Sequence, residues 1–106
     1  MSIYRLVLTT VAKKADAERI AVHFIKKKLA ACVNQIGPVR SYYTWKGKFC
    51  RDSEYLLLIK TKQDLVKELE RELGRLHPYE IPEVIVVPLT GGSKKYLRWL
   101  GQVLKS

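Results

Sequence analysis

The sequence predicts an α+β domain with elements in the order β-α-β-β-α-β, followed by a further helix. Short β-branched runs alternate with segments whose apolar residues recur at helical spacing. A glycine-containing turn at residues 46–47 separates two long segments rich in Val, Ile, Tyr, Phe and Leu, which is typical of a hairpin. A chain of 106 residues has the size of one domain, so residues 1–106 are expected to form a single unit.

The first strand is expected over residues 3–9, an apolar and β-branched run in which Arg5 is the only charge. Such a run is typical of a buried strand. A helix follows from Ala15, because six apolar residues repeat with a period of three and four: Ala17, Ile20, Ala21, Phe24, Ile25 and Leu29. Asp16 suits the positive end of its dipole, and the lysines at 26–28 suit the negative end.

A long hairpin is expected from two strands over residues 31–45 and 48–60, with a bulge or bend at Gly37 and Pro38. Strands of ~13 residues would span about 43 Å, longer than the ~34 Å diameter of a compact domain of this length. Four aromatic side chains occupy its outer half: Tyr42, Tyr43, Trp45 and Phe49. We therefore expect an arm that pairs with a neighbouring subunit; a shorter, twisted hairpin folded over its own sheet is the alternative.

The second half of the chain supplies the remaining elements. Residues 61–64 resemble a capping box, and the leucines behind it repeat at helical spacing as far as Leu76. Residues 84–87 have the composition of a buried strand, and Ser93 can cap a last helix that reaches Leu104. This order is the ferredoxin-like split βαβ arrangement, a four-stranded sheet with helices on one face.

Charge favours acidic partners, because 20 Lys and Arg outnumber 10 Asp and Glu and give a formal net charge of +10. The basic residues are scattered along the chain, so a generally basic surface is expected and no specific nucleic-acid site. No apolar run approaches the ~20 residues that span a bilayer, and no secretory signal is visible. We expect a cytoplasmic protein without a membrane partner.

No catalytic pattern is present: the sequence contains no Ser/His/Asp or Cys/His order and no glycine-rich phosphate loop. An enzyme is therefore not expected. The two cysteines are too few for a disulfide framework. If facing residues of the hairpin sum to about 93, Cys32 faces Thr61 and Cys50 faces Tyr43. The two sulfurs would then lie on the order of 35 Å apart, which excludes a disulfide within the chain.

Cys32 and His77 are the candidate metal ligands, since a thiolate and an imidazole suit copper or zinc. Cys32 begins the hairpin, and His77 ends the second helix. Neither has a second ligand at metal-binding spacing. The structural alternatives are a small buried apolar residue for Cys32 and a helix stop for His77.

Several segments, in this order and spacing, resemble the divalent-cation tolerance protein family, CutA: residues 9–10, 29–34, 43–48, 60–61, 77–83 and 96–99. The resemblance covers roughly residues 3–100. It implies a ferredoxin-like fold, a homotrimer built through long hairpin arms and a cytoplasmic location. It also implies tolerance of copper and other divalent cations through metal binding rather than catalysis. PII signalling proteins have a similar trimer, so a regulatory module that binds a small anionic ligand is the alternative.

The resemblance assigns residues as follows. Cys32 and His77 match the family's cysteine and histidine and are the expected metal ligands. Five further residues match positions expected near a cleft between subunits: Lys60, Tyr79, Glu83, Tyr96 and Trp99. The chain departs from the family at residues 11–12, where many members carry a cysteine and a proline, and Cys50 matches no family position. A trimer that is purely structural, with incidental metal contacts, is a further possibility.

Overall fold

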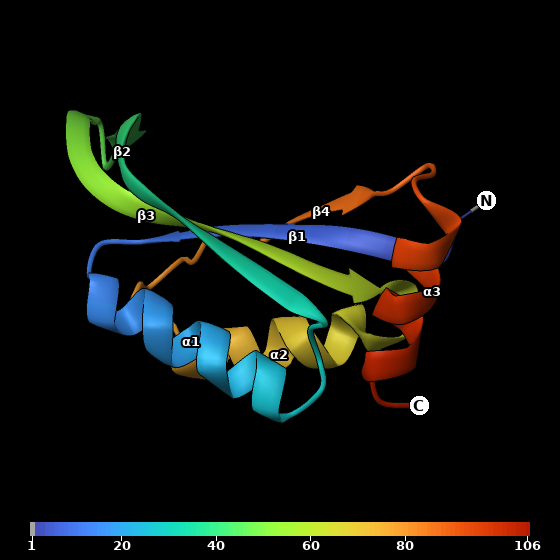
Figure 1. Ribbon diagram of the computed structural model, residues 1–106. Helices are drawn as coiled ribbons and strands as arrows, with labels where there is room; N and C mark the ends of the chain where they lie inside the picture. The colour runs from blue at the N-terminus through green and yellow to red at the C-terminus, as the bar shows by residue number, and fades with distance from the viewer. Residues whose placement is uncertain (1) are drawn as a thin grey trace.

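A computed structural model describes residues 2–106 and has the expected order of elements (Figure 1). Four strands and three α-helices are joined by short connections, and a 3₁₀ turn over Gln63–Leu65 precedes the second helix. The elements are β1 (Tyr4–Val11), α1 (Lys14–Lys26), β2 (Cys32–Trp45), β3 (Lys48–Lys62), α2 (Val66–Leu76), β4 (Ile85–Pro88) and α3 (Lys94–Val103). The predicted α+β class and ferredoxin-like order are confirmed.

The strands form one antiparallel sheet in the order β2-β3-β1-β4, with α1 and α2 on one of its faces and α3 at one end (Figure 1). Alternate residues of the central strands point toward the helices. The side chains that are fully buried there include Val7, Val11, Ile20, Phe24, Leu57, Ile59, Leu69, Leu73 and Leu100. The core therefore lies between the sheet and the helices.

The other side of the sheet, here called the open face, is also apolar. The register places the side chains of Leu6 and Leu8 on this face, beside Leu56 and Leu58. All four are only partly buried. On β4, Ile85 is 48% exposed. The prediction of a buried last strand is wrong for the single chain, because β4 lies at the edge of the sheet and its neighbourhood on the open face is uncovered.

The hairpin turns at Lys46 and Gly47, whose φ angles of 51° and 76° match the type I′ turn that fits the twist of paired strands. Its outer half, residues 39–54, is called the arm here and bends away from the helices (Figure 1). The molecule extends 44 Å along its longest axis and only 25 Å and 22 Å along the others. A long hairpin is thus confirmed.

The predicted bulge lies between Ile36 and Val39, where Gly37 and Pro38 interrupt the pairing. It corrects the expected register: Cys50 faces Tyr43 as predicted, but Cys32 faces Lys60 and not Thr61. The reason is the extra residue in β2, which shifts the inner half of the hairpin by one position. A Cβ atom at Gly37 would lie 2.6 Å from a ring carbon of Tyr55, so the bulge requires glycine there. Both cysteines are free thiols.

Thr61 does not cap the second helix, contrary to the prediction. It belongs to β3, and its hydroxyl donates a hydrogen bond of 2.7 Å to the carbonyl of Leu29. The 3₁₀ turn begins without a side-chain cap. The predicted cap of α3 is confirmed, since Oγ of Ser93 accepts a hydrogen bond from the backbone N–H of Tyr96.

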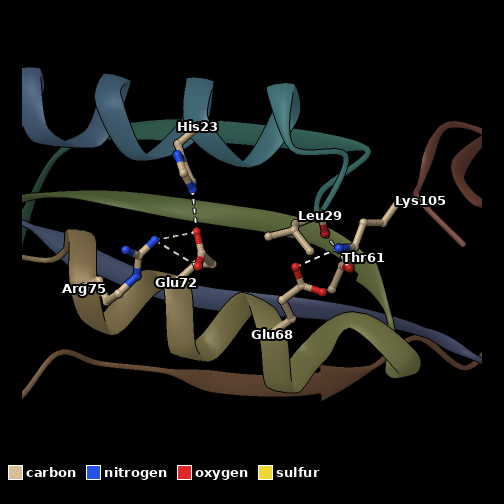
Figure 2. Close-up of polar contacts among 7 residues, drawn as sticks. All are labelled: His23, Leu29, Thr61, Glu68, Glu72, Arg75 and Lys105. Atoms are coloured by element: carbon tan, nitrogen blue, oxygen red, sulfur yellow. Dashed lines mark hydrogen bonds and ion pairs between the residues drawn. The ribbon is translucent and has the colours of Figure 1, made fainter.

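Polar contacts join the helices to one another (Figure 2). Nε2 of His23 lies 2.9 Å from a carboxylate oxygen of Glu72, which also binds the guanidinium of Arg75. The hydrogen bonds from His23 and Arg75 lower the pKa of Glu72. Near the C-terminus, Nζ of Lys105 donates a hydrogen bond of 2.7 Å to Glu68. These contacts tie α1 and the C-terminal segment to α2.

Candidate functional site

The five residues expected near one cleft fall into two groups at opposite ends of the sheet. Tyr79 and Glu83 lie in the segment after α2, beside the base of the arm. Lys60, Tyr96 and Trp99 gather near the start of α3. Within one chain the five residues therefore lie apart, and their meeting in a cleft between subunits stays a prediction.

Lys60, Tyr96 and Trp99, here called the lysine–aromatic cluster, lie on and beside the open face. Nζ of Lys60 donates a hydrogen bond of 3.2 Å to the hydroxyl of Tyr96 and lies 5.5 Å from the centre of its ring. The rings of Tyr96 and Trp99 are 5.5 Å apart, and both side chains are about two-fifths exposed. Cys32 faces Lys60 across the strands. The cluster thus presents an ammonium group and two rings, with Cys32 as the cross-strand neighbour of Lys60.

The second group belongs to a cleft of about 830 Å³, here called the acidic cleft, between the arm and the segment after α2. Its polar and aromatic walls are formed by Thr10, Ser41, Tyr42, Tyr43, Trp45, Asp52, Ser53, Glu54, Tyr79, Glu80 and Glu83, together with Ala12 and Ile81. Four of the chain's ten acidic residues line it, and no lysine or arginine does. A chain of net charge +10 therefore contains one concave region of negative charge.

Two tyrosines donate hydrogen bonds to carboxylates in the acidic cleft. Glu54 is only 5% exposed, and its Oε2 accepts a bond of 2.6 Å from the hydroxyl of Tyr79. Burial, and then this bond, raise the pKa of Tyr79. The hydroxyl of Tyr43 donates to Asp52, a bond that raises the pKa of Tyr43 to about 12. Both phenols consequently remain neutral donors at physiological pH.

Glu83 lies near a second negative charge. Burial raises its pKa, and the charge of Glu54 raises it further. The charges of Glu54 and Glu83 therefore repel one another. A cation placed among them would relieve this repulsion.

His77 supports the loop that carries Tyr79. It is 6% exposed, its Nε2 lies 2.9 Å from the carbonyl of Thr10, and its Nδ1 accepts a hydrogen bond from the backbone N–H of Tyr79. This pattern assigns the proton to Nε2. Burial lowers the pKa of His77, so the imidazole is neutral at pH 7. A metal ion could bind Nδ1 only after the N–H of Tyr79 had moved away.

Cys32 and His77 are not neighbours. Cys32 faces Lys60, and Lys60 faces Leu6 of β1. His77 meets the same strand at Thr10. The four steps from Leu6 to Thr10 span about 13 Å along a strand. Within residues 2–106, the histidine, cysteine and acidic side chains do not form a group of three arranged to hold a metal ion.

Comparison with known proteins assigns the family. Residues 5–103 match the model of the CutA1 divalent ion tolerance proteins. The chain belongs to the CutA1 family. It is 39% identical over 95 residues to the divalent-cation tolerance protein CutA of Thermus thermophilus, covering 90% of this chain and 92% of that protein. It is 45% identical over 95 residues to the chloroplastic CutA protein of Arabidopsis thaliana, covering 90% of this chain and 52% of that protein.

Solved CutA structures have the same fold. The chain superimposes on CutA1 of Oryza sativa with a TM-score of 0.94 and 40% identity, covering 98% of this chain and 96% of that one. For CutA of Xylella fastidiosa the TM-score is 0.95 at 36% identity, with 98% and 100% covered. The CutA1 chain spans about half the length of the plant and mammalian relatives it matches. None of the helices described for residues 2–106 is long and apolar enough to cross a membrane.

The acidic cleft of this CutA1 chain contains residues that the sequence analysis missed: Asp52, Glu54 and Tyr43. Glu54 continues the alternation of Leu56 and Leu58 and therefore lies on the open face of β3. An acidic residue in line with leucines is an unusual neighbour for an apolar face. That alternation was the available signal for a functional carboxylate.

The buried imidazole predicts a pH dependence of stability. Because the pKa of His77 is lower in the folded chain than in the unfolded one, the unfolded chain takes up the proton first as pH falls. The free energy of unfolding should therefore decrease as pH falls below about 6.5, until the folded pKa is passed. In His77→Gln this decrease should be smaller, as measured by urea unfolding between pH 5 and pH 8. His23→Gln is the control, and an equal change in both variants would contradict the assignment.

Proposed function

We propose that this CutA1 chain acts in the tolerance of divalent cations as a cytoplasmic homotrimer of one-domain subunits that binds Cu²⁺ or a similar cation without catalysis. The observation that carries the proposal, beside the family, is the acidic cleft in an otherwise basic chain. Carboxylate and hydroxyl oxygens favour divalent cations, and neutral imidazole or thiolate favours copper. The relative from Archaeoglobus fulgidus is described as periplasmic, so location is a separate point to test.

Assembly is supported by two apolar surfaces. The open face of the sheet presents leucines on the side away from α1 and α2, where a second subunit would bury them. On the arm, Tyr42 is 62% exposed and Phe49 is 68% exposed. Surfaces of this kind are typical of sites that contact another protein.

The proposed copper ligands are Cys32 and His77, each near a region where subunits would meet. Cys32 is on the open face beside Lys60. His77 lies behind the acidic cleft, whose Glu83 and Glu54 can supply oxygen ligands. A neighbouring subunit would have to supply the remaining ligands, because Cys32 and His77 lie apart within one chain.

A Cu²⁺ titration against a competing chelator tests the proposal, with the oligomer mass recorded on the same reduced sample. We expect stoichiometric binding by a trimer and at least tenfold weaker binding after Cys32→Ala combined with His77→Ala. Cys50→Ala is the matched control, since it removes the thiol at the far end of the hairpin. Unchanged affinity in the double variant would show that these residues are not the ligands.

The lysine–aromatic cluster supports a second candidate, a PII-like regulatory module that binds a small anionic ligand between subunits. Lys60 supplies positive charge, and the exposed rings of Tyr96 and Trp99 supply a surface for stacking. The acidic cleft is a poor place for such a ligand, because its walls carry no cation. A thermal-shift screen of nucleotides and other metabolites distinguishes the two functions: a specific anion should raise the melting temperature, and Lys60→Met should abolish the shift.

A further inference from the structure

Basic side chains that are scattered along the sequence come together at the end of the domain away from the arm (Figure 1). The backbone N–H of Ala31 donates a hydrogen bond of 2.9 Å to the carbonyl of Lys60, which joins the loop after α1 to β3. The N–H of Lys105, just after α3, donates to the carbonyl of Lys28, and Nζ of Lys60 contacts Tyr96 of α3. Six basic residues in these neighbouring segments are here called the basic end: Lys26, Lys27, Lys28, Lys60, Lys95 and Arg98.

The charge of the basic end is not compensated within the chain. Among residues 2–106, none of its six members takes part in an ion pair, whereas the neighbouring Lys105 is paired with Glu68. The acidic cleft lies at the other end of the sheet, and salt screens exposed charges that are more than about 8–10 Å apart. Its carboxylates therefore leave the positive charge of the basic end available to a partner.

The end of α1 carries a lysine in a backbone conformation that favours glycine. The N–H of Leu29 donates to the carbonyl of Phe24, and that of Lys28 donates to the carbonyl of Ile25, which is the Schellman pattern. The φ angle of Lys28 is 58°, the left-handed conformation in which a side chain is strained. The chain therefore has an ammonium group at a position where glycine would give a more stable helix end. Such a position indicates a role for the side chain outside the fold.

The exposed side of α3 combines charge with aromatic rings. Lys95, Arg98 and Trp99 follow one another at helical spacing, and all three are exposed, as is Tyr96 beside them. The apolar side of α3 is not available to lipid, because Leu100 is fully buried in the core. Positive charge that can follow a phosphate backbone, together with exposed rings on which bases can stack, is typical of surfaces that bind single-stranded nucleic acid.

We propose that the basic end binds single-stranded nucleic acid without sequence preference. The lysines after α1, together with Lys95 and Arg98, contact phosphates, and a base stacks on Trp99. This function goes beyond the proposed cation tolerance and does not depend on it. The sequence led us to expect a generally basic surface; the fold instead brings the loop after α1 and the start of α3 to one end.

Neutralising two lysines at either end of α1 tests the site, with binding of a fluorescein-labelled oligothymidylate followed by anisotropy over a range of NaCl concentrations. Lys26→Gln combined with Lys27→Gln should weaken binding roughly tenfold and make the slope of log K against log[NaCl] shallower by about 1.4, since each phosphate contact in a single strand contributes about 0.7. Lys13→Gln combined with Lys14→Gln is the matched control, because these exposed lysines at the start of α1 make the same change in net charge. The control should change the affinity less than about twofold.

Two further positions separate binding from folding. Lys28→Gly should raise the urea concentration at the midpoint of unfolding, because it relieves the strained conformation, and should weaken binding about threefold. A misfolded variant could not do both. Trp99→Leu should weaken binding at least about fivefold, and Trp99→Tyr should restore most of the loss, because a tyrosine ring can still stack on a base.

Four results would overturn the proposal. Equal weakening by the two double variants would mean that net charge alone attracts the strand. Unchanged affinity in Trp99→Leu would remove the stacking. Thymidine monophosphate that binds as tightly as the oligonucleotide would indicate a site for a small anion, and tighter binding to vesicles containing phosphatidylserine would indicate a membrane surface. None of these results affects the proposed cation binding, which the Cu²⁺ titration tests separately.

Discussion

Replacing Phe24 with alanine should lower the free energy of unfolding by about 3–5 kcal/mol. Phe24 is fully buried and is the largest such side chain among the described residues, in the layer between α1 and the sheet. Its loss removes apolar burial and leaves a cavity that the rigid sheet cannot fill. Because domains of this kind have a total stability of about 5–15 kcal/mol, much of the stability would be lost. Urea unfolding at fixed protomer concentration measures the change.

Ile25→Ala is the matched control, because the next residue along α1 is 43% exposed. Its cost should be about 1 kcal/mol or less, since little apolar surface returns to water. Equal losses in the two variants would mean that α1 packs in a different rotation against the sheet.

Tyr79→Phe should cost about 2 kcal/mol, because it removes the hydrogen bond to the buried carboxylate of Glu54. A buried charge that loses its hydrogen-bond donor raises the free energy of the folded chain, because water cannot replace the donor. The loss should appear in urea unfolding at pH 7, and it should be accompanied by a change in the near-ultraviolet circular dichroism of the remaining aromatic groups.

Tyr43→Phe provides the comparison within the same cleft. It removes the same kind of hydrogen bond, but the contact between Tyr43 and Asp52 is exposed to solvent. Water can therefore replace the lost donor at the carboxylate of Asp52. A cost below about 1 kcal/mol is expected. If Tyr43→Phe were as costly as Tyr79→Phe, burial of Glu54 would not be the cause.

The elements could be predicted from the sequence because their periods are local properties. Leucines at helical spacing predicted α2, and Ser93 predicted the start of α3. The prediction of a cap for the second helix failed because a residue distant in the chain determines the hydrogen bond of Thr61. Threonine is a residue type that often caps helices, which is why Thr61 was predicted as a cap. Its hydroxyl instead donates a hydrogen bond to the carbonyl of Leu29, which is 32 residues away in the chain. Local patterns contain no information about such a partner.

The candidate site was predicted only in part, because local patterns do not show which distant residues meet. Tyr79 and Glu83 stand out in a short polar segment, whereas the only sequence signal for Glu54 was its place in the alternation with Leu56 and Leu58. Family resemblance supplies residues without their separation in space: within one chain Lys60 and Glu83 lie apart, and their grouping in a cleft between subunits stays a prediction. The register would have separated them, since Lys60 faces Leu6 near one end of β1, whereas Thr10 of the acidic cleft is near the other.

The alternation of side chains along the hairpin constrains how the arm can change in length during evolution. Strand alternation assigns every arm residue to one face, and the sheet fixes the inner half of the hairpin. Deleting one facing pair would therefore turn all residues nearer the turn to the opposite face. Deleting two facing pairs would shorten the arm and keep both faces intact. Viable length variants of this arm should consequently differ by even numbers of facing pairs.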